Sequence, residues 1–401
     1  MKRRDFVLSA ASSMALAHAG AWASATPAAP AAPSLYEPTR YVFVADKMSN
    51  FISVIDLVSG KHVESLDFGI RPHVFEMARD DDAMMAVASP EATQICFFNL
   101  KTRETTRMKL PAPVYQIFFV PQSKLVALGM RDCVGMIDYD EFTLKVFDRK
   151  FDSPNRKTVL DSFYFLLFSS FSQSFWVLDE EKPRIFHKYG KDSAKSKWDE
   201  IDFSGRIKTN RGFDVGIASP EDYLLTMTTE DGNEGLVYFP ESDKLLSTGS
   251  MRTTTNTYKP MLMPYIDFYT KNVIFGNKEG QMAHFDLESG SDKPERFTVD
   301  FSPRFIRSGW LESTWVLAGD KGIMFQSLKD PADRKVFRFV AEVTNVWVTG
   351  DSKTALITID EGYPQIIPYD IRTRERLKPI LTPGVSMANI IRMSSNNSIC
   401  Y

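Results

Sequence analysis

The sequence of 401 residues is poor in histidine and cysteine, with five histidines and three cysteines in total. The cysteines Cys96, Cys133 and Cys400 match no zinc or copper spacing, and three scattered cysteines predict no disulfide. No Cys-x-x-Cys-His motif is present, which excludes covalently attached c-type haem. A Gly-x-Ser-x-Gly elbow and a Walker loop are also absent, so no motif indicates a serine hydrolase or a nucleoside triphosphatase.

Long apolar runs and basic clusters are missing as well. No run after residue 34 is long enough to span a bilayer. The net charge is −3, and loss of the N-terminal segment with Lys2, Arg3, Arg4 and Asp5 makes the chain more acidic. A mildly acidic chain without a basic patch is a poor nucleic-acid binder, so we expect neither nucleic-acid binding nor membrane insertion.

Residues 1–25 have the pattern of a twin-arginine signal peptide. Arg3 and Arg4 lie in the run Lys-Arg-Arg-Asp-Phe-Val, a mildly apolar stretch follows, and small-x-small cleavage sites occur at residues 21–23 and 23–25. An ordinary secretory signal is the alternative. Residues 26–40 form a Pro/Ala-rich spacer, whose prolines favour neither helix nor strand. We therefore predict a mature protein in the periplasm, exported by the twin-arginine route.

A short pattern recurs about every 40 to 50 residues, an alternating apolar strand that ends in Asp or Asn and is followed by a turn. Clear copies end at Asp56, Asn99, Asp138 and Asp286. A unit of this length with about four short strands is one blade of a β-propeller. The aromatic content of 12%, with 30 phenylalanines, suits sheets that pack face to face.

The sequence thus predicts an all-β fold, an eight-bladed β-propeller of four-stranded antiparallel blades in one domain at residues 41–401. The third strands of the eight units are predicted to end at Asp56, Asn99, Asp138, Lys188, Phe239, Asp286, Ser327 and Asp370. Seven blades is the alternative, because residues 148–211 are irregular. Residues 41–45 resemble a second strand and residues 387–393 an orphan first strand. Pairing of these two strands would close the ring and leave no exposed sheet edge.

In a propeller of this strand order, the connections from the fourth strand of one blade to the first strand of the next surround the central channel. Several of these connections carry a cation: Arg71, Lys208, Arg211, Arg252, Lys259 and Arg304. Cations that converge on a narrow mouth raise the local positive potential and attract an anionic ligand. The alternative is that they are ordinary polar loop residues. The loop at residues 249–260 is the most unusual, because it combines many hydroxyl groups with two cations and a tyrosine.

His73 is the one histidine of the mature chain in such a connection, since His62, His187 and His284 are predicted to lie on strands. A neutral imidazole at this place could ligate a metal or haem iron. The alternative is that Arg-Pro-His only shapes the turn into the next blade. Tyr115 ends the connection that follows the second unit, and we include it among the candidate cofactor-binding residues.

The repeat and the Arg-Pro-His turn resemble the YVTN-type propeller superfamily, over residues 41–393. That group includes the haem d1 propeller of cytochrome cd1 nitrite reductase with its biosynthetic relatives, and the heavy subunits of quinoprotein amine dehydrogenases. In the haem d1 relatives an axial histidine follows a glycine shortly after the last strand of the first blade, and Gly69 and His73 match this placement. The resemblance implies that Arg71, Arg211, Arg252 and Arg304 would hold the carboxylates of the macrocycle.

We expect a non-enzymatic binding protein of the periplasm, an accessory subunit or assembly factor of a redox enzyme system. Its partner would be a periplasmic protein or an anionic small ligand. The first alternative is a protein that binds haem d1 or takes part in its biosynthesis, with His73 as axial ligand. The second alternative is the heavy subunit of a quinoprotein amine dehydrogenase, whose cofactor lies in a separate small subunit.

Overall fold

The computed structural model describes residues 33–393, apart from residues 38, 47, 79–81, 132, 148–165, 190–196, 210, 230, 232–233, 254–260, 268–270, 312, 360–364, 384 and 386–387. The chain divides into two compact units, Met1–Ser34 and Leu35–Tyr401. The predicted signal peptide and the first part of the spacer lie outside the described residues, so the predicted domain boundaries stay predictions. Every regular element in the described part is a β-strand, and no helix there could cross a membrane.

The strands of the second unit form seven antiparallel sheets, six of which have four strands in the described residues. The first sheet, with the order β3-β2-β1-β31, contains β1 (Tyr41–Asp46), β2 (Phe51–Asp56), β3 (Lys61–Asp67) and β31 (Ala388–Met393). The next sheet contains β4 (Val74–Met77), β5 (Met84–Ala88), β6 (Gln94–Asn99) and β7 (Thr105–Lys109). The third sheet contains β8 (Val114–Phe119), β9 (Leu125–Met130), β10 (Val134–Asp138) and β11 (Thr143–Phe147).

The following three sheets repeat this order. The fourth sheet contains β12 (Leu166–Ser169), β13 (Ser174–Leu178), β14 (Arg184–Tyr189) and β15 (Asp199–Asp202). The fifth contains β16 (Phe213–Ala218), β17 (Leu225–Thr229), β18 (Gly235–Phe239) and β19 (Lys244–Ser247). The sixth contains β20 (Tyr265–Asp267), β21 (Asn272–Gly276), β22 (Gln281–Asp286) and β23 (Glu295–Thr298).

The seventh sheet is larger. It contains β24 (Pro303–Gly309), β25 (Thr314–Ser327), β26 (Arg334–Val348), β27 (Thr354–Ile359), β28 (Gln365–Asp370), β29 (Glu375–Arg376) and β30 (Ile380–Leu381). The first half of β25 pairs with β24 and its second half pairs with the first half of β26, whose second half pairs with β27. The sequence predicts separate strands here, whereas the structure joins them, because the connections are too short to interrupt the extended backbone.

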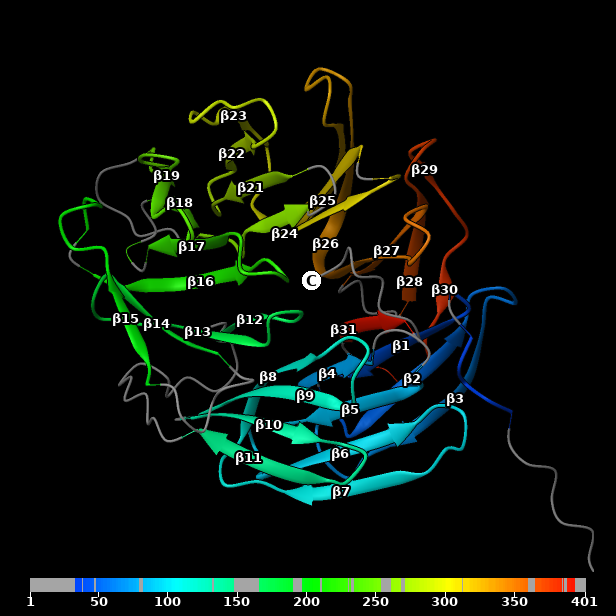
Figure 1. The fold of residues 1–401 in the computed structure, drawn as a ribbon. Coiled ribbons are helices and arrows are strands. Elements are labelled where there is room, and N and C mark those ends of the chain that lie inside the picture. Colours follow the sequence, from blue (N-terminus) through cyan, green and yellow to red (C-terminus); the bar gives the residue numbers. More distant parts are fainter. Residues whose placement is uncertain are drawn as a thin grey trace, which may run out of the picture. The chain divides into compact units, whose positions relative to one another are not determined.

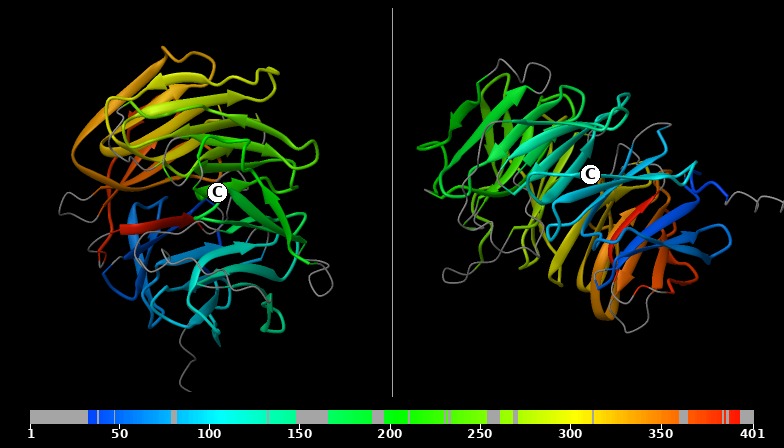
Figure 2. Two further views of the ribbon diagram at one scale, coloured as in Figure 1. Left: turned by 90° about the vertical axis from the view of Figure 1, so that its left-hand side faces the viewer. Right: turned by 90° about the horizontal axis from the view of Figure 1, so that it is seen from below.

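The predicted pairing of the N-terminal strand with the C-terminal strand is present. β1 pairs antiparallel with β31, with Val42 opposite Met393 and Val44 opposite Ile391. The red strand lies beside the blue ones in each view of the ribbon (Figures 1 and 2). This pairing gives β1 a neighbour on both sides, so the start of the ordered sheet presents no free edge there.

The first strand of each sheet lies on the inside and the fourth strand on the outside (Figure 1). First strands of neighbouring sheets contact each other, as β4 does with β8 and β31 does with β4. We call β31, β4, β8, β12, β16, β20, β24 and the second half of β26 the inner strands. Cores form between neighbouring sheets, and one of them combines Phe43 and Val54 of the first sheet with Phe75 and Val87 of the second.

The recurring Asp or Asn has a local role that explains its position. Asp56 Oδ1 accepts hydrogen bonds from the backbone N–H groups of Val58 and Ser59, at 2.9 and 3.4 Å. The same pattern follows Asn99, Asp138 and Asp286. The fourth residue after the strand end has a left-handed backbone in six units: Gly60, Arg103, Phe142, Asp243, Gly290 and Arg374. The side chain thus fixes the turn, and all eight predicted ends of third strands are confirmed.

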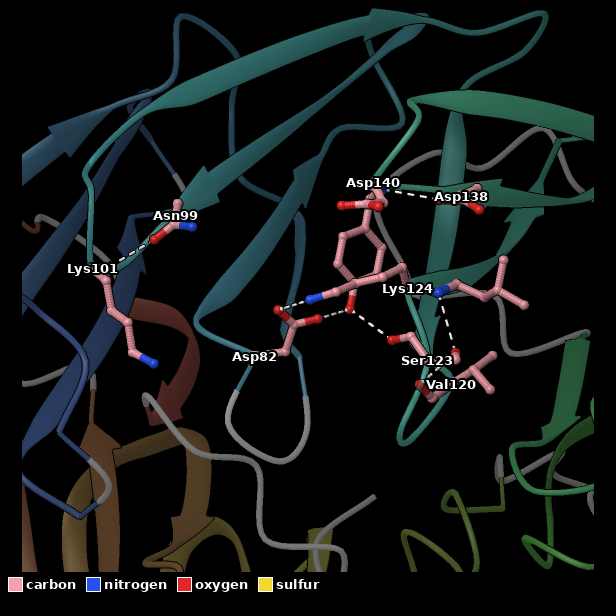
Figure 3. A network of polar contacts seen from close by, with 10 residues as sticks. Asp82, Asn99, Lys101, Val120, Ser123, Lys124, Asp138 and Asp140 are labelled. Atoms are coloured by element: carbon pink, nitrogen blue, oxygen red, sulfur yellow. Dashed lines mark hydrogen bonds and ion pairs between the residues drawn. The ribbon is translucent and has the colours of Figure 1, made fainter.

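Polar contacts about one repeat apart in sequence connect neighbouring sheets. Asp82 lies at the turn between β4 and β5, and its Oδ1 is 2.6 Å from Nζ of Lys124 at the start of β9 (Figure 3). The Tyr139 hydroxyl donates to the same carboxylate and is also within 3.0 Å of the Ser123 carbonyl. The acidic turn before β5 therefore joins the second and third sheets.

Candidate functional site

The connections that lead into the inner strands hold most of the predicted binding residues. Arg71 and His73 lie between β3 and β4, Arg211 and Lys208 lie between β15 and β16, and Arg252 follows β19. Because every sheet is entered at its inner strand, these connections lie at one end of the sheets, together with the turns between second and third strands. We call this end the loop face.

Acidic side chains of neighbouring segments neutralise several loop-face cations. Arg71 Nη2 is 3.2 Å from Oε2 of Glu91, which lies in the turn between β5 and β6. Arg304, the second residue of β24, forms an ion pair with Glu342 on β26. Each of these pairs is exposed, so its own contribution to stability is at most about 1 kcal/mol. The pairs nevertheless leave a charge-balanced rim at these two connections rather than a uniformly positive one.

The first part of the 249–260 loop is held by contacts from both neighbouring sheets. Arg252 donates to the backbone carbonyl of Asp231, in the turn between β17 and β18. Thr253 donates through Oγ1 and its backbone N–H to Glu279 Oε2, at 2.6 and 3.2 Å, and Asn277 Nδ2 donates to the Met251 carbonyl at 2.8 Å.

A further arginine holds the same segment from the outer strand. Arg296 of β23 donates to the carbonyls of Thr248 and Ser250, the latter at 2.9 Å. Sequence analysis missed Arg296, Glu279 and Glu91, because none of them lies in a connection to an inner strand. The observable signal was their position about 26 to 48 residues from a predicted cation or hydroxyl, close to one repeat.

The remaining predicted residues are in different surroundings. His73 is partly buried, and its backbone N–H donates to the Arg71 carbonyl at 2.9 Å, which forms the tight turn expected of Arg-Pro-His. Tyr115 is 6% exposed and belongs to a core with Leu166 and Phe168 of the next sheet. Lys259 lies outside the described residues, and Arg211 is exposed. No contact described above joins two of the predicted binding residues directly.

The other histidines lie on strands, as predicted. His62 is on β3, His187 on β14 and His284 on β22. Burial lowers the pKa of His187 and of His284 below the usual value, so both imidazoles are neutral at pH 7. His187 stacks on Trp176 with ring centroids 3.8 Å apart, which is a packing role. Within the described ranges no group of three or more histidine, cysteine or acidic side chains is arranged to hold a metal ion.

Cys96 and Cys133 are both buried and unbridged. Cys96 lies on β6 and its Sγ is 3.9 Å from the carbonyl of Phe68, while burial raises the pKa of its thiol. Cys400 lies outside the described residues.

The chain matches no protein-family model and no curated protein. Solved structures do resemble it. "Dihydro-heme d1 dehydrogenase NirN in complex with DHE" is 12% identical with a TM-score of 0.69, over 92% of this chain and 78% of that chain. Apo AztD from Citrobacter koseri is 9% identical with a TM-score of 0.57, over 88% and 96% of the two chains. The C-terminal WD40 domain of Sif2 is 9% identical with a TM-score of 0.56, over 91% of each chain. All three are β-propellers, and the likeness establishes that this chain has the β-propeller fold.

Proposed function

We propose that the protein is a non-enzymatic binding propeller of the periplasm, which engages a partner protein or an anionic ligand through its loop face as an accessory component of a redox system. The observation that carries this proposal is the anchored start of the 249–260 loop. Asp231, Glu279, Asn277 and Arg296 hold that segment at four places. A loop held in place by a rigid scaffold loses little entropy on binding, which favours affinity.

The balance of charge on the loop face favours a partner with charges of both signs. Glu91 and Glu342 each accompany an arginine, so a purely anionic surface would meet carboxylates as well as cations. A protein surface with mixed charges fits this arrangement and gains specificity from it. Location in the periplasm and the twin-arginine route depend on residues outside the described part, and they remain predictions from the sequence.

The test is a comparison of three forms of the full-length protein as bait in periplasmic extract. The double variant Arg252→Ala/Lys259→Ala is expected to recover its specific partner at least tenfold less well than the wild type, because hot-spot truncations cost about 1.4 kcal/mol or more. The matched control is Lys61→Ala/Lys329→Ala, since both lysines are exposed at turns between third and fourth strands, at the opposite end of the sheets. Equal recovery with both double variants would contradict the proposal.

A second candidate function is the binding of a haem d1-type tetrapyrrole, favoured by the fold likeness to NirN, whose structure is described as a complex. The position of His73 fits an axial ligand, because the imidazole belongs to a connection at the loop face and its backbone is fixed by Arg71. The carboxylate-binding role fits less well. Arg71 and Arg304 already hold Glu91 and Glu342, which carboxylates of the macrocycle would have to displace.

Titration with extracted haem d1, followed by visible spectroscopy, tests the second candidate. If His73 supplies the axial nitrogen, wild-type protein is expected to give a saturable shift of the Soret band, and His73→Ala is expected to lose it. His62→Ala is the matched control, because His62 lies on the outer strand β3 and contacts Ser65. A shift that is equal in wild type and His73→Ala would exclude axial ligation by His73.

We further infer eight blades from the pairing in the seventh sheet. β24 and the first half of β25 repeat the inner half of a blade, and the second half of β26 pairs with β27 as an inner strand does. The seventh sheet would then hold two blades of four strands each, joined along β26. A role as the heavy subunit of an amine dehydrogenase rests on the sequence resemblance alone.

A further inference from the structure

Arg307 on the inner strand β24 has a guanidinium group with almost no partners in the protein. Nη1 donates to the carbonyl of Ile306, the preceding residue, at 2.7 Å. Nε is buried without a hydrogen-bond acceptor among the described residues. The side chain as a whole is partly exposed, so solvent or a small ligand can reach the guanidinium. A buried donor without an acceptor is costly, and a charged one more so.

Most other arginines with ion pairs show what is missing. Arg103 pairs with Glu64, Arg184 with Asp179, and Arg374 with Asp333. Arg307 takes part in no ion pair within the described residues, although it lies on an inner strand. Its situation therefore differs from that of the outer arginines, which bind carboxylates about one repeat away.

The comparison with Arg392 on β31 is the most informative. Arg392 Nη1 donates to the carbonyl of Ile391, the preceding residue, at 2.9 Å, as Arg307 does to Ile306. In addition, Arg392 Nε donates to Glu76 Oε1 at 2.8 Å. The corresponding atom of Arg307 is the one that lacks an acceptor.

The strand register places these residues at equivalent positions of four successive inner strands. Arg307, Trp347, Arg392 and Glu76 lie opposite Val316, Leu356, Phe43 and Ala86, each the third residue of the second strand in its unit. β24 contacts β26, β26 contacts β31, and β31 contacts β4. The neighbour of Arg392 at this level is Glu76, whereas the neighbour of Arg307 is Trp347, an indole that accepts no hydrogen bond.

Trp347 cannot be replaced as neighbour by rotation of its side chain. It is 3% exposed, and the guanidinium of Arg392 lies 4.6 Å from its ring centroid. Arg307 thus faces a fixed aromatic residue at the place where Arg392 meets a carboxylate.

We propose that Arg307 binds an external oxyanion, a carboxylate or phosphate group, at the position that corresponds to the Glu76 carboxylate beside Arg392. The anion accepts from the Nε and Nη2 side of the guanidinium, which is the two-point geometry that arginine provides. This site lies on the inner strands and is independent of the partner proposed for the loop face.

Isothermal titration calorimetry of the full-length protein at constant ionic strength, with citrate and with inorganic phosphate as separate probes, tests the proposal. Wild-type protein is expected to bind at least one probe with a dissociation constant of about 1 mM or tighter. Arg307→Gln is expected to weaken that binding by at least about tenfold, since a charge-assisted hydrogen bond is lost. Binding of citrate alone would identify a carboxylate, and binding of phosphate alone a phosphate group.

Two controls separate a site from a general effect of the anion. Arg334→Gln removes an exposed arginine of β26 that donates only to the Thr298 carbonyl at 3.4 Å, and it should leave the affinity unchanged. The melting temperature without probe should not fall in Arg307→Gln, because no protein partner is lost. Absence of binding to wild type, or equal affinities of wild type and Arg307→Gln, would overturn the proposal.

Discussion

A chain that ends at Val385, and so lacks β31, is expected to be largely insoluble or to form soluble aggregates. The missing strand exposes the edge of β1 over residues 42–46, where backbone N–H and C=O groups now pair with β31. Ile391 and Met393, both fully buried, are lost with it. Loss of a buried side chain of this size costs about 2 to 5 kcal/mol, so the two together approach the whole stability of a typical domain.

The truncation also breaks contacts that connect three inner strands. Arg392 binds Glu76 of β4 and lies 4.6 Å from the ring centroid of Trp347 of β26. Removal of the arginine leaves the Glu76 carboxylate, which is 21% exposed, without this partner. An exposed strand edge next to an opened core is the usual starting point of aggregation.

Soluble yield, size-exclusion chromatography and thermal unfolding by circular dichroism measure the effect. The matched control is a chain that ends at Met393, which keeps all of β31 and removes only residues outside the described part. That control should elute and melt like the full-length protein. If the chain ending at Val385 also melted within a few degrees of the full-length protein, the pairing of β1 with β31 would contribute little to the fold.

The architecture was largely predictable because its signals are local. Each Asp or Asn at a strand end bonds backbone groups two and three residues later, as Asp56 does with Val58 and Ser59. Such a contact is written into a short stretch of sequence and repeats with the unit. The joined strands β25 and β26 were not predictable in the same way, because the length of a connection alone does not show whether the backbone stays extended through it.

The candidate site was less predictable, because its contacts join residues far apart in sequence. The cation Arg304 was visible as a loop residue, but its partner Glu342 lies 38 positions later on another inner strand. Arg307 was overlooked because the search followed connections, and its position on a strand became meaningful only through the register that aligns it with Arg392. Side-chain partners depend on how the sheets stack, which no local pattern specifies.

The substitution Gly235→Ala is expected to destabilise the fold by about 1 to 3 kcal/mol through overpacking between two sheets. Gly235 begins β18, and a Cβ atom there would lie 2.2 Å from Cδ1 of Phe275 on β21. The Phe275 ring is fully buried and packs edge-on against Phe285 at 6.2 Å, so it has little room to move. The missing side chain of Gly235 is therefore what allows the fifth and sixth sheets to approach each other.

Urea unfolding of Gly235→Ala, of Phe275→Leu and of the double variant measures this effect. The smaller side chain at position 275 relieves the clash, so the double variant should be more stable than the sum of the single changes predicts, by about 0.5 kcal/mol or more. Gly205→Ala is the matched control: its Cβ would meet no atom within 4 Å, and its φ of +80° costs only about 1 kcal/mol of backbone strain. Strict additivity of the two changes would show that Gly235 acts through its backbone and not through the space it leaves for Phe275.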